Sequence, residues 1–140
     1  MNSISIVADI EEIDNAFGED SPFRLKKDAK YHNLKQKDLD KMAEAISDEI
    51  QQGFDRTACV VIFWTETRKG NYCKIRVANE EKNSGKSGGY RCVVLWDNIA
   101  KEGFLLHIFE HKDKDNLTAV EKKALKNLVC QYILNRYKEL

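Results

Sequence analysis

Apolar residues in the middle of the chain occur in four short runs, separated by segments rich in glycine, asparagine and charged residues. The runs cover residues 58–65, 72–78, 90–96 and 104–110. Runs of this length that contain many β-branched and aromatic residues predict β-strands. Because the connections between them are short, we expect consecutive strands to pair as an antiparallel meander.

Two longer segments repeat apolar residues at helical spacing, one before these strands and one after them. The first spans residues 35–52 and is followed by Gly53, a residue type common at helix ends. Its apolar stripe consists of Leu39, Met42, Ala43, Ile46 and Ile50. The second begins at T-A-V-E, where Thr118 is the predicted N-cap and Glu121 completes a capping box. Its predicted core stripe consists of Val120, Ala124, Leu125, Leu128, Val129, Tyr132 and Ile133.

The residues before this first helix have a weaker pattern. Residues 1–21 place apolar side chains at partly helical spacing, and residues 23–31 are basic with helical character. The order of helices, then strands, then a helix predicts an α+β fold. We therefore expect N-terminal helices, a four-stranded antiparallel sheet and a C-terminal helix.

Charge is unevenly distributed along the 140-residue chain, whose net charge is zero. Residues 1–23 hold six acidic and no basic side chains, whereas the remaining residues hold 23 basic and 17 acidic ones, a net charge of +6. This predicts an acidic N-terminal extension, residues 1–22, followed by one domain, residues 23–140. The extension is either a solvated tail or a segment that lies over a basic surface.

The composition also indicates where in the cell the protein is expected and whether it is expected to bind a metal. No apolar run approaches the about 20 residues that span a membrane, and the N-terminus lacks the basic start of a secretory signal. We therefore expect a cytoplasmic protein. Four cysteines, Cys59, Cys73, Cys92 and Cys130, lie in apolar strand or helix patterns without a C-x-x-C pair. Buried thiols are favoured over a zinc site, and neither a metal nor a cofactor is expected.

The strand at residues 72–78 has a basic face. Tyr72, Lys74 and Arg76 share this face because successive side chains of a strand alternate. Arg91 begins the next strand, so strand pairing can bring it close to Lys74 and Arg76. Cations beside an aromatic ring suit a phosphate and a stacked base. This pattern indicates an anion or nucleic-acid site, the alternative being solvated charges on an exposed sheet face.

Three segments resemble a known family: K-I-R-V-A at residues 74–78, G-K-S-G-G-Y-R at 85–91, and F-E-H-K-D-K-D-N-L-T-A-V-E-K-K-A-L-K-N-L at 109–128. They resemble toxins of the RelE/ParE superfamily, nearest its HigB-like and RelE-like branch, over about residues 23–135. The resemblance implies an αα-ββββ-α fold and a type II toxin–antitoxin system. It also implies metal-independent cutting of mRNA on the ribosome, with attack of a 2′-hydroxyl on the adjacent phosphate. The implied partners are a cognate antitoxin, mRNA and the ribosome, and no membrane.

The resemblance also implies roles for individual residues. Lys74 and Arg76 would hold the RNA backbone, and Arg91 would contact the scissile phosphate. His111 stands where many relatives have lysine, and because histidine exchanges a proton near neutral pH, it is the hypothetical acid or base. The further candidates for RNA contact are Lys86, Lys112, Lys114 and Tyr72.

Other interpretations remain open for one histidine and for the function. His107 lies on the last predicted strand, and a hydrogen-bonded core histidine is favoured there over a catalytic one. A toxin of the same fold that inhibits DNA gyrase without cutting RNA is a second function. An inactive or self-masked nucleic-acid-binding module is a third.

Overall fold

The computed structural model describes residues 3–79, 88–114 and 116–140. Within these residues, one five-stranded sheet is covered by four helices. The strands are β1 (Ser5–Val7), β2 (Cys59–Trp64), β3 (Gly70–Val77), β4 (Tyr90–Asp97) and β5 (Glu102–Glu110). The helices are α1 (Ile10–Phe17), α2 (Leu25–Tyr31), α3 (Gln36–Gln51) and α4 (Ala119–Tyr137). The predicted α+β class is confirmed.

The sheet has the strand order β1-β5-β4-β3-β2. Strands β2 to β5 form the predicted antiparallel meander, with β2 at one edge. At the other edge, β1 pairs parallel to β5, with Ser5 opposite Glu102 and Val7 opposite Phe104. The prediction of four antiparallel strands is therefore wrong in detail, because the sheet is mixed and has a fifth strand. A strand of three residues is too short for its alternation to stand out in the sequence.

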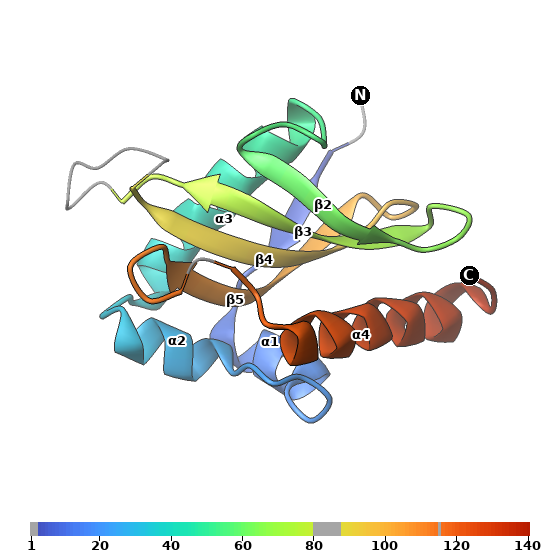
Figure 1. Ribbon diagram of the computed structural model, residues 1–140, viewed down its shortest axis with the longest axis horizontal. Helices are drawn as coiled ribbons and strands as arrows, with labels where there is room; N and C mark the ends of the chain where they lie inside the picture. The colour runs from blue at the N-terminus through green and yellow to red at the C-terminus, as the bar shows by residue number, and fades with distance from the viewer. Residues whose placement is uncertain (1–2, 80–87, 115) are drawn as a thin grey trace.

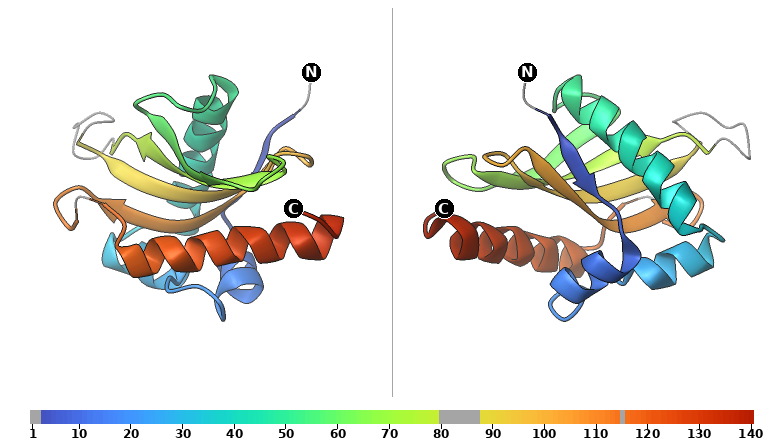
Figure 2. Two further views of the ribbon diagram at one scale, coloured as in Figure 1. Left: turned by 45° about the vertical axis from the view of Figure 1, so that its right-hand side comes forward. Right: turned by 180° about the vertical axis from the view of Figure 1, so that it is seen from behind.

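The helices form two layers, one on each face of the sheet (Figures 1 and 2). Helix α3 crosses one face, as the view from behind in Figure 2 shows, and buries the predicted residues Leu39, Met42, Ile46 and Ile50. Helices α1, α2 and α4 lie on the other side (Figure 1). Helix α3 ends where predicted, since Gly53 has a φ of 110°, a backbone conformation that favours glycine.

The N-terminal segment is integrated into the fold. Helix α1 buries Ile13 and Phe17, and the Phe17 ring packs edge-on against Phe104 of β5, with the ring centroids 5.2 Å apart. Two of the segment's acids act locally: Asp9 accepts a hydrogen bond from the Glu12 amide and caps α1, and Asp14 accepts one from the Leu25 amide. Residues 5–17 are thus not a solvated tail, while the domain division after residue 22 stays a prediction.

Helix α2 covers the part of the β5 edge that the short β1 leaves unpaired. The Ile108 amide of β5 donates to Asp28 Oδ2 over 3.1 Å, and His32 Nε2 lies 3.3 Å from the Ile108 carbonyl oxygen. Asp28 also holds His107, whose Nδ1 lies 2.7 Å from Oδ2. The side chains of Asp28 in α2 and of His32 after it therefore replace strand partners and protect this edge from pairing with another chain.

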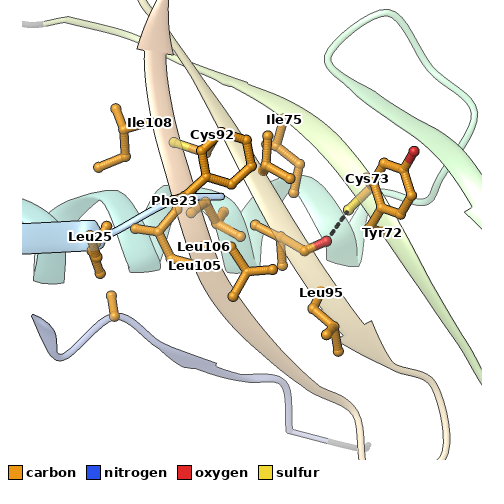
Figure 3. Close-up of a cluster of buried hydrophobic side chains, with 14 of the residues drawn as sticks. Phe23, Leu25, Tyr72, Cys73, Ile75, Cys92, Leu95, Leu105, Leu106 and Ile108 are labelled. Carbon is orange, nitrogen blue, oxygen red and sulfur yellow. Dashed lines mark hydrogen bonds between the residues drawn. The ribbon is translucent and has the colours of Figure 1, made fainter. Parts of the chain in front are cut away.

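The core lies on both sides of β4, and all eight residues of that strand are buried. Figure 3 shows side chains of β3, β4 and β5 packed with Phe23 and Leu25. The predicted burial of thiols is confirmed for Cys59, Cys73 and Cys92, whereas Cys130 is half-buried. These three thiols act as small apolar residues in the core.

Helix α4 packs closely against β3. A Cβ atom on Gly70 would lie 2.7 Å from Ile133 Cδ1, so glycine is needed for this approach. The predicted capping box at Thr118 and Glu121 is present. The predicted burial of Val120 is wrong, since Val120 is 77% exposed. It lies in the first turn of the helix, on the side turned toward solvent.

A buried carboxylate connects α4 to the sheet. Asp97, at the end of β4, is fully buried and accepts hydrogen bonds from the hydroxyls of Tyr132 (2.9 Å) and Tyr137 (2.7 Å). The amides of Ile99 and Ala100 also donate to it, over 3.0 and 2.9 Å. Burial, together with the hydrogen bond and the charge of Asp97, raises the pKa of Tyr137 to about 12. Both tyrosines therefore stay neutral donors near pH 7.

Replacing this carboxylate should destabilise the protein. We expect Asp97→Ala to lower the free energy of unfolding by about 3 kcal/mol, because two tyrosine hydroxyls lose a charged acceptor. Urea unfolding followed by circular dichroism measures the change. Asp20→Ala, at an exposed position, is the matched control and should shift the free energy by less than about 0.5 kcal/mol. Equal stabilities of the two variants would contradict the anchoring role.

Candidate nucleic-acid interface

The register of β3 and β4 brings the predicted cations together. Arg76 lies directly opposite Arg91, and Lys74 lies opposite Val93, two residues further along β4. Residues directly opposite one another in an antiparallel pair project from the same face. Lys74, Arg76 and Arg91 therefore share one face of the sheet, as their spacing in the sequence predicts.

The three cations influence one another in a partly desolvated place. Arg91 is only 5% exposed, and its Nη1 donates to the Gly89 carbonyl oxygen over 3.4 Å. Burial, followed by the nearby charge of Arg76, lowers the pKa of Arg91, although a guanidinium stays charged near neutral pH. Burial, with the charges of Arg91, Arg76 and Lys122, likewise lowers the pKa of Lys74. Like charges held this close favour the arrival of an anion.

Two further residues that the sequence analysis did not assign adjoin this face: Asn116, which precedes α4, and Lys122 in the first turns of that helix. Lys74 Nζ donates to Asn116 Oδ1 over 3.4 Å, and Lys122 is close enough to lower the pKa of Lys74. A signal was present in the sequence, because Lys122 and Lys126 are four residues apart and so lie on the same face of a helix. Lys126 places its ammonium 5.2 Å from the centroid of the Phe63 ring.

The turn after β5 carries the remaining described candidates. His111 is exposed, and the Lys112 side chain is 65% exposed, with Nζ 3.9 Å from Glu110 Oε2. Lys114 is more enclosed: its Nζ donates to Glu121 Oε2 over 2.9 Å and lies 4.9 Å from the centroid of the Phe109 ring. His111 and Lys112 are therefore accessible to a ligand, and Lys114 is held mainly by the protein.

Two predicted aromatic residues lie inside the protein. Tyr72, labelled in Figure 3 among the buried side chains, is only 2% exposed. Its hydroxyl donates to the Lys122 carbonyl oxygen over 3.4 Å, so a base cannot stack on the ring in this conformation. The alternation pattern alone suggested that Tyr72 is exposed, because it does not show that α4 packs over β3. His107 is a hydrogen-bonded core histidine, as favoured, and it stacks on Phe23 with ring centroids 3.8 Å apart. Lys86 lies outside the described residues.

The arrangement can bind a phosphate and stabilise negative charge that develops on it. Three cations converge on one face, and an exposed histidine that can transfer a proton lies in the turn after β5. Among the described residues, one group of potential metal ligands occurs, formed by His32, Glu110 and Asp113. These residues are separate from the cationic face.

Comparison with known proteins identifies the family. A family model described as the RelE toxin of the RelE / RelB toxin-antitoxin system matches residues 65–140, which is more than half of the chain. The chain belongs to the RelE toxin family. The matched region contains β3, β4, β5 and α4, and with them every candidate residue for RNA contact or proton transfer. No curated protein and no solved structure matches the chain.

This membership confirms the resemblance noted in the sequence. The protein is a toxin of a toxin–antitoxin system, and a cognate antitoxin is its implied partner. In the part of the chain that the structure describes, no helix combines the length and apolar character needed to cross a membrane.

The cap at the start of α4 should respond to pH. Burial alone would raise the pKa of Glu121, but the Thr118 amide and Lys114 outweigh it and lower that pKa. The contribution of Glu121 to stability is thus present above the unfolded-state pKa of about 4.3 and is lost as the pH falls through the lower folded-state value. We expect Glu121→Gln to be less stable at pH 7 by on the order of 1 kcal/mol.

Urea unfolding at several pH values checks this expectation. The difference between wild type and Glu121→Gln should shrink as the pH falls below about 4. Glu139→Gln, whose side chain is 76% exposed, is the control and should show little difference at any pH. A gap between wild type and Glu121→Gln that is constant with pH would show that the charge of Glu121 has no part in the cap.

Proposed function

We propose that this RelE-family toxin is a metal-independent endoribonuclease of the HigB-like and RelE-like branch, which cuts mRNA on the ribosome in the cytoplasm. The single observation that supports this most is the convergence of Lys74, Arg76 and Arg91 on one face within a toxin fold. Such a face suits the phosphate backbone of RNA, which supplies closely spaced negative charges.

In the proposed reaction, the 2′-oxygen of one nucleotide attacks the phosphorus of the adjacent phosphodiester. The new O–P bond forms as the bond from phosphorus to the 5′-oxygen of the next nucleotide breaks. A base takes the proton from the 2′-hydroxyl, and an acid gives a proton to the departing 5′-oxygen. The products are a 2′,3′-cyclic phosphate and a 5′-hydroxyl, so the step needs no oxidant, reductant or further reactant.

The cationic residues act on the charge that builds on phosphorus in this step. Arg91 is held by its burial and by its contact with Gly89, so little reorganisation is needed when the phosphate arrives. Preorganised donors of this kind are typically worth a factor of about 10² to 10³ in rate. Lys74 and Arg76 hold the neighbouring backbone, and Lys122 adds positive potential.

We assign proton transfer to His111, which is exposed directly after β5. Lys112 supports the RNA from the same turn. Lys114, which is paired with Glu121, contributes mainly through its charge. Lys86 stays a predicted contact, and Tyr72 serves the core in the described conformation.

Removing the central arginine tests the phosphate site. We expect Arg91→Ala to reduce mRNA cutting in a translating extract by about 100-fold or more, because the cation nearest the scissile phosphate is lost. Lys37→Ala is the matched control, since Lys37 is an exposed cation on α3, the helix that covers the other face. Circular dichroism confirms that each variant is folded. Full cutting by a folded Arg91→Ala protein would contradict the assignment.

The same assay separates the alternatives. A wild-type protein that leaves mRNA intact but blocks supercoiling by DNA gyrase would be a non-enzymatic toxin of this fold. A protein that binds RNA without either effect would be an inactive or self-masked binding module.

Removing the histidine tests proton transfer. We expect His111→Gln to lower the cutting rate by about 10² or more and to remove an inflection near neutral pH from the pH–rate profile. The comparison is with Lys112→Gln, which should weaken RNA binding while keeping the inflection. Wild-type rates for His111→Gln would mean that His111 is only a surface residue.

A further inference from the structure

Three potential metal ligands meet at a junction of chain segments distant in the sequence. His32 follows α2, Glu110 ends β5, and Asp113 lies in the turn after it. One ligand atom from each residue lies within 4.8 Å of the others. The side chains of His32 and Glu110 are only 4% and 10% exposed, so these two potential ligands are nine-tenths or more buried.

The hydrogen bonding of His32 orients one ring nitrogen toward this cluster. Its Nε2 lies 3.3 Å from the Ile108 carbonyl oxygen. A carbonyl oxygen only accepts hydrogen bonds, so Nε2 carries the proton. In the neutral ring, Nδ1 then has a lone pair, and it lies 3.3 Å from the carboxylate oxygen Oε1 of Glu110. Two acceptors this close in a buried place are stabilised by a cation between them, a proton or a metal ion, in addition to Lys112, whose Nζ lies 3.9 Å from Glu110 Oε2.

The surroundings of the third ligand support the same interpretation. The Tyr31 hydroxyl donates to Asp113 Oδ1 over 2.9 Å, which orients the carboxylate and leaves Oδ2 available. A backbone carbonyl behind a histidine and a hydroxyl behind a carboxylate are the partners that commonly orient metal ligands.

We propose that His32 Nδ1, Glu110 and Asp113 bind a divalent transition metal, with Zn²⁺ as the best fit. One imidazole and two carboxylates match its ligand preferences, and a water would complete four-coordination. Metal–ligand bonds of about 2.0–2.2 Å require the ligand atoms to approach one another. Asp113 can supply most of this movement, since it is exposed and lies in a turn.

The proposed metal site is separate from the cationic face of Lys74, Arg76 and Arg91, and its ligands Glu110 and Asp113 flank His111 and Lys112 in the sequence. Glu110 lies opposite Tyr90, whereas the preceding residue, Phe109, lies opposite Arg91. Glu110 and Arg91 therefore project from opposite faces of the sheet. The metal would tie the end of α2 to the turn that carries His111 and Lys112. This role is structural and therefore compatible with metal-independent cutting of RNA. Because no cysteine takes part, the spacing of cysteines in the sequence could not reveal the metal site.

Metal binding to the full-length, untagged protein tests the proposal. After treatment with a chelator and its removal, titration calorimetry should show one Zn²⁺ per chain, and added Zn²⁺ should raise the melting temperature. His32→Gln and Asp113→Asn should each weaken Zn²⁺ binding by roughly tenfold or more. His111→Gln is the matched control, because it removes a neighbouring exposed histidine, and it should bind Zn²⁺ as wild type does.

Every outcome bears on the proposal. Absence of Zn²⁺ binding, or binding that Asp113→Asn leaves unchanged, would overturn it, and this exposed substitution should leave the fold intact. Absorption spectra with Co²⁺ should lack the thiolate charge-transfer band, whose presence would mean that a cysteine site binds the metal. A melting temperature that does not respond to Zn²⁺ would likewise overturn the proposal and leave the contact between His32 and Glu110 as an ion pair. Arg91→Ala should keep full Zn²⁺ affinity. A failure of the proposed function can therefore be distinguished from the absence of this metal site.

Discussion

The antiparallel register of β3 and β4 is the constraint on which the rest of this structure depends. It sets Arg76 opposite Arg91 and places the buried thiols of Cys73 and Cys92 and the side chain of Ile75 on the other face. A slip of one residue would send Lys74 and Arg76 into the core and bring Ile75 to the surface. The cost of burying unpaired cations makes that alternative inaccessible, so core packing and the cationic face specify the same register.

Two carboxylates, the buried Asp97 and the partly buried Asp28, attach helices to this sheet. Asp97 receives two tyrosine hydroxyls from α4, and Asp28 of α2 receives the Ile108 amide and holds His107. These contacts join elements that are far apart in the sequence. They keep α4 against β3, where its start meets Lys74, and they keep α2 along the β5 edge, where His32 meets Glu110. Both proposed sites therefore depend on polar contacts that also organise the helical layers.

Local patterns predicted the features that arise from neighbouring residues. The meander, helix α3 and the capping box at Thr118 follow from alternation, helical spacing and side-chain-to-backbone bonds within a few residues. The shared face of Lys74 and Arg76 follows as well, because their side chains alternate with Ile75 on one strand, and Arg91 at the start of the next strand was within reach of them by pairing. Burial of Tyr72 and exposure of Val120 could not be predicted in this way, since both depend on where α4 lies relative to the sheet.

The sequence by itself determined the α+β class, the meander, the cationic strand pair and the membership of the RelE toxin family. Each of these is encoded in residue types at short spacing. Only the tertiary structure decided that β1 joins the sheet in parallel, that Lys122 and Asn116 adjoin Lys74, and that His32 meets Glu110 and Asp113. The physical reason is that these contacts join distant segments, whose encounter is set by the packing of the whole core and by no local pattern.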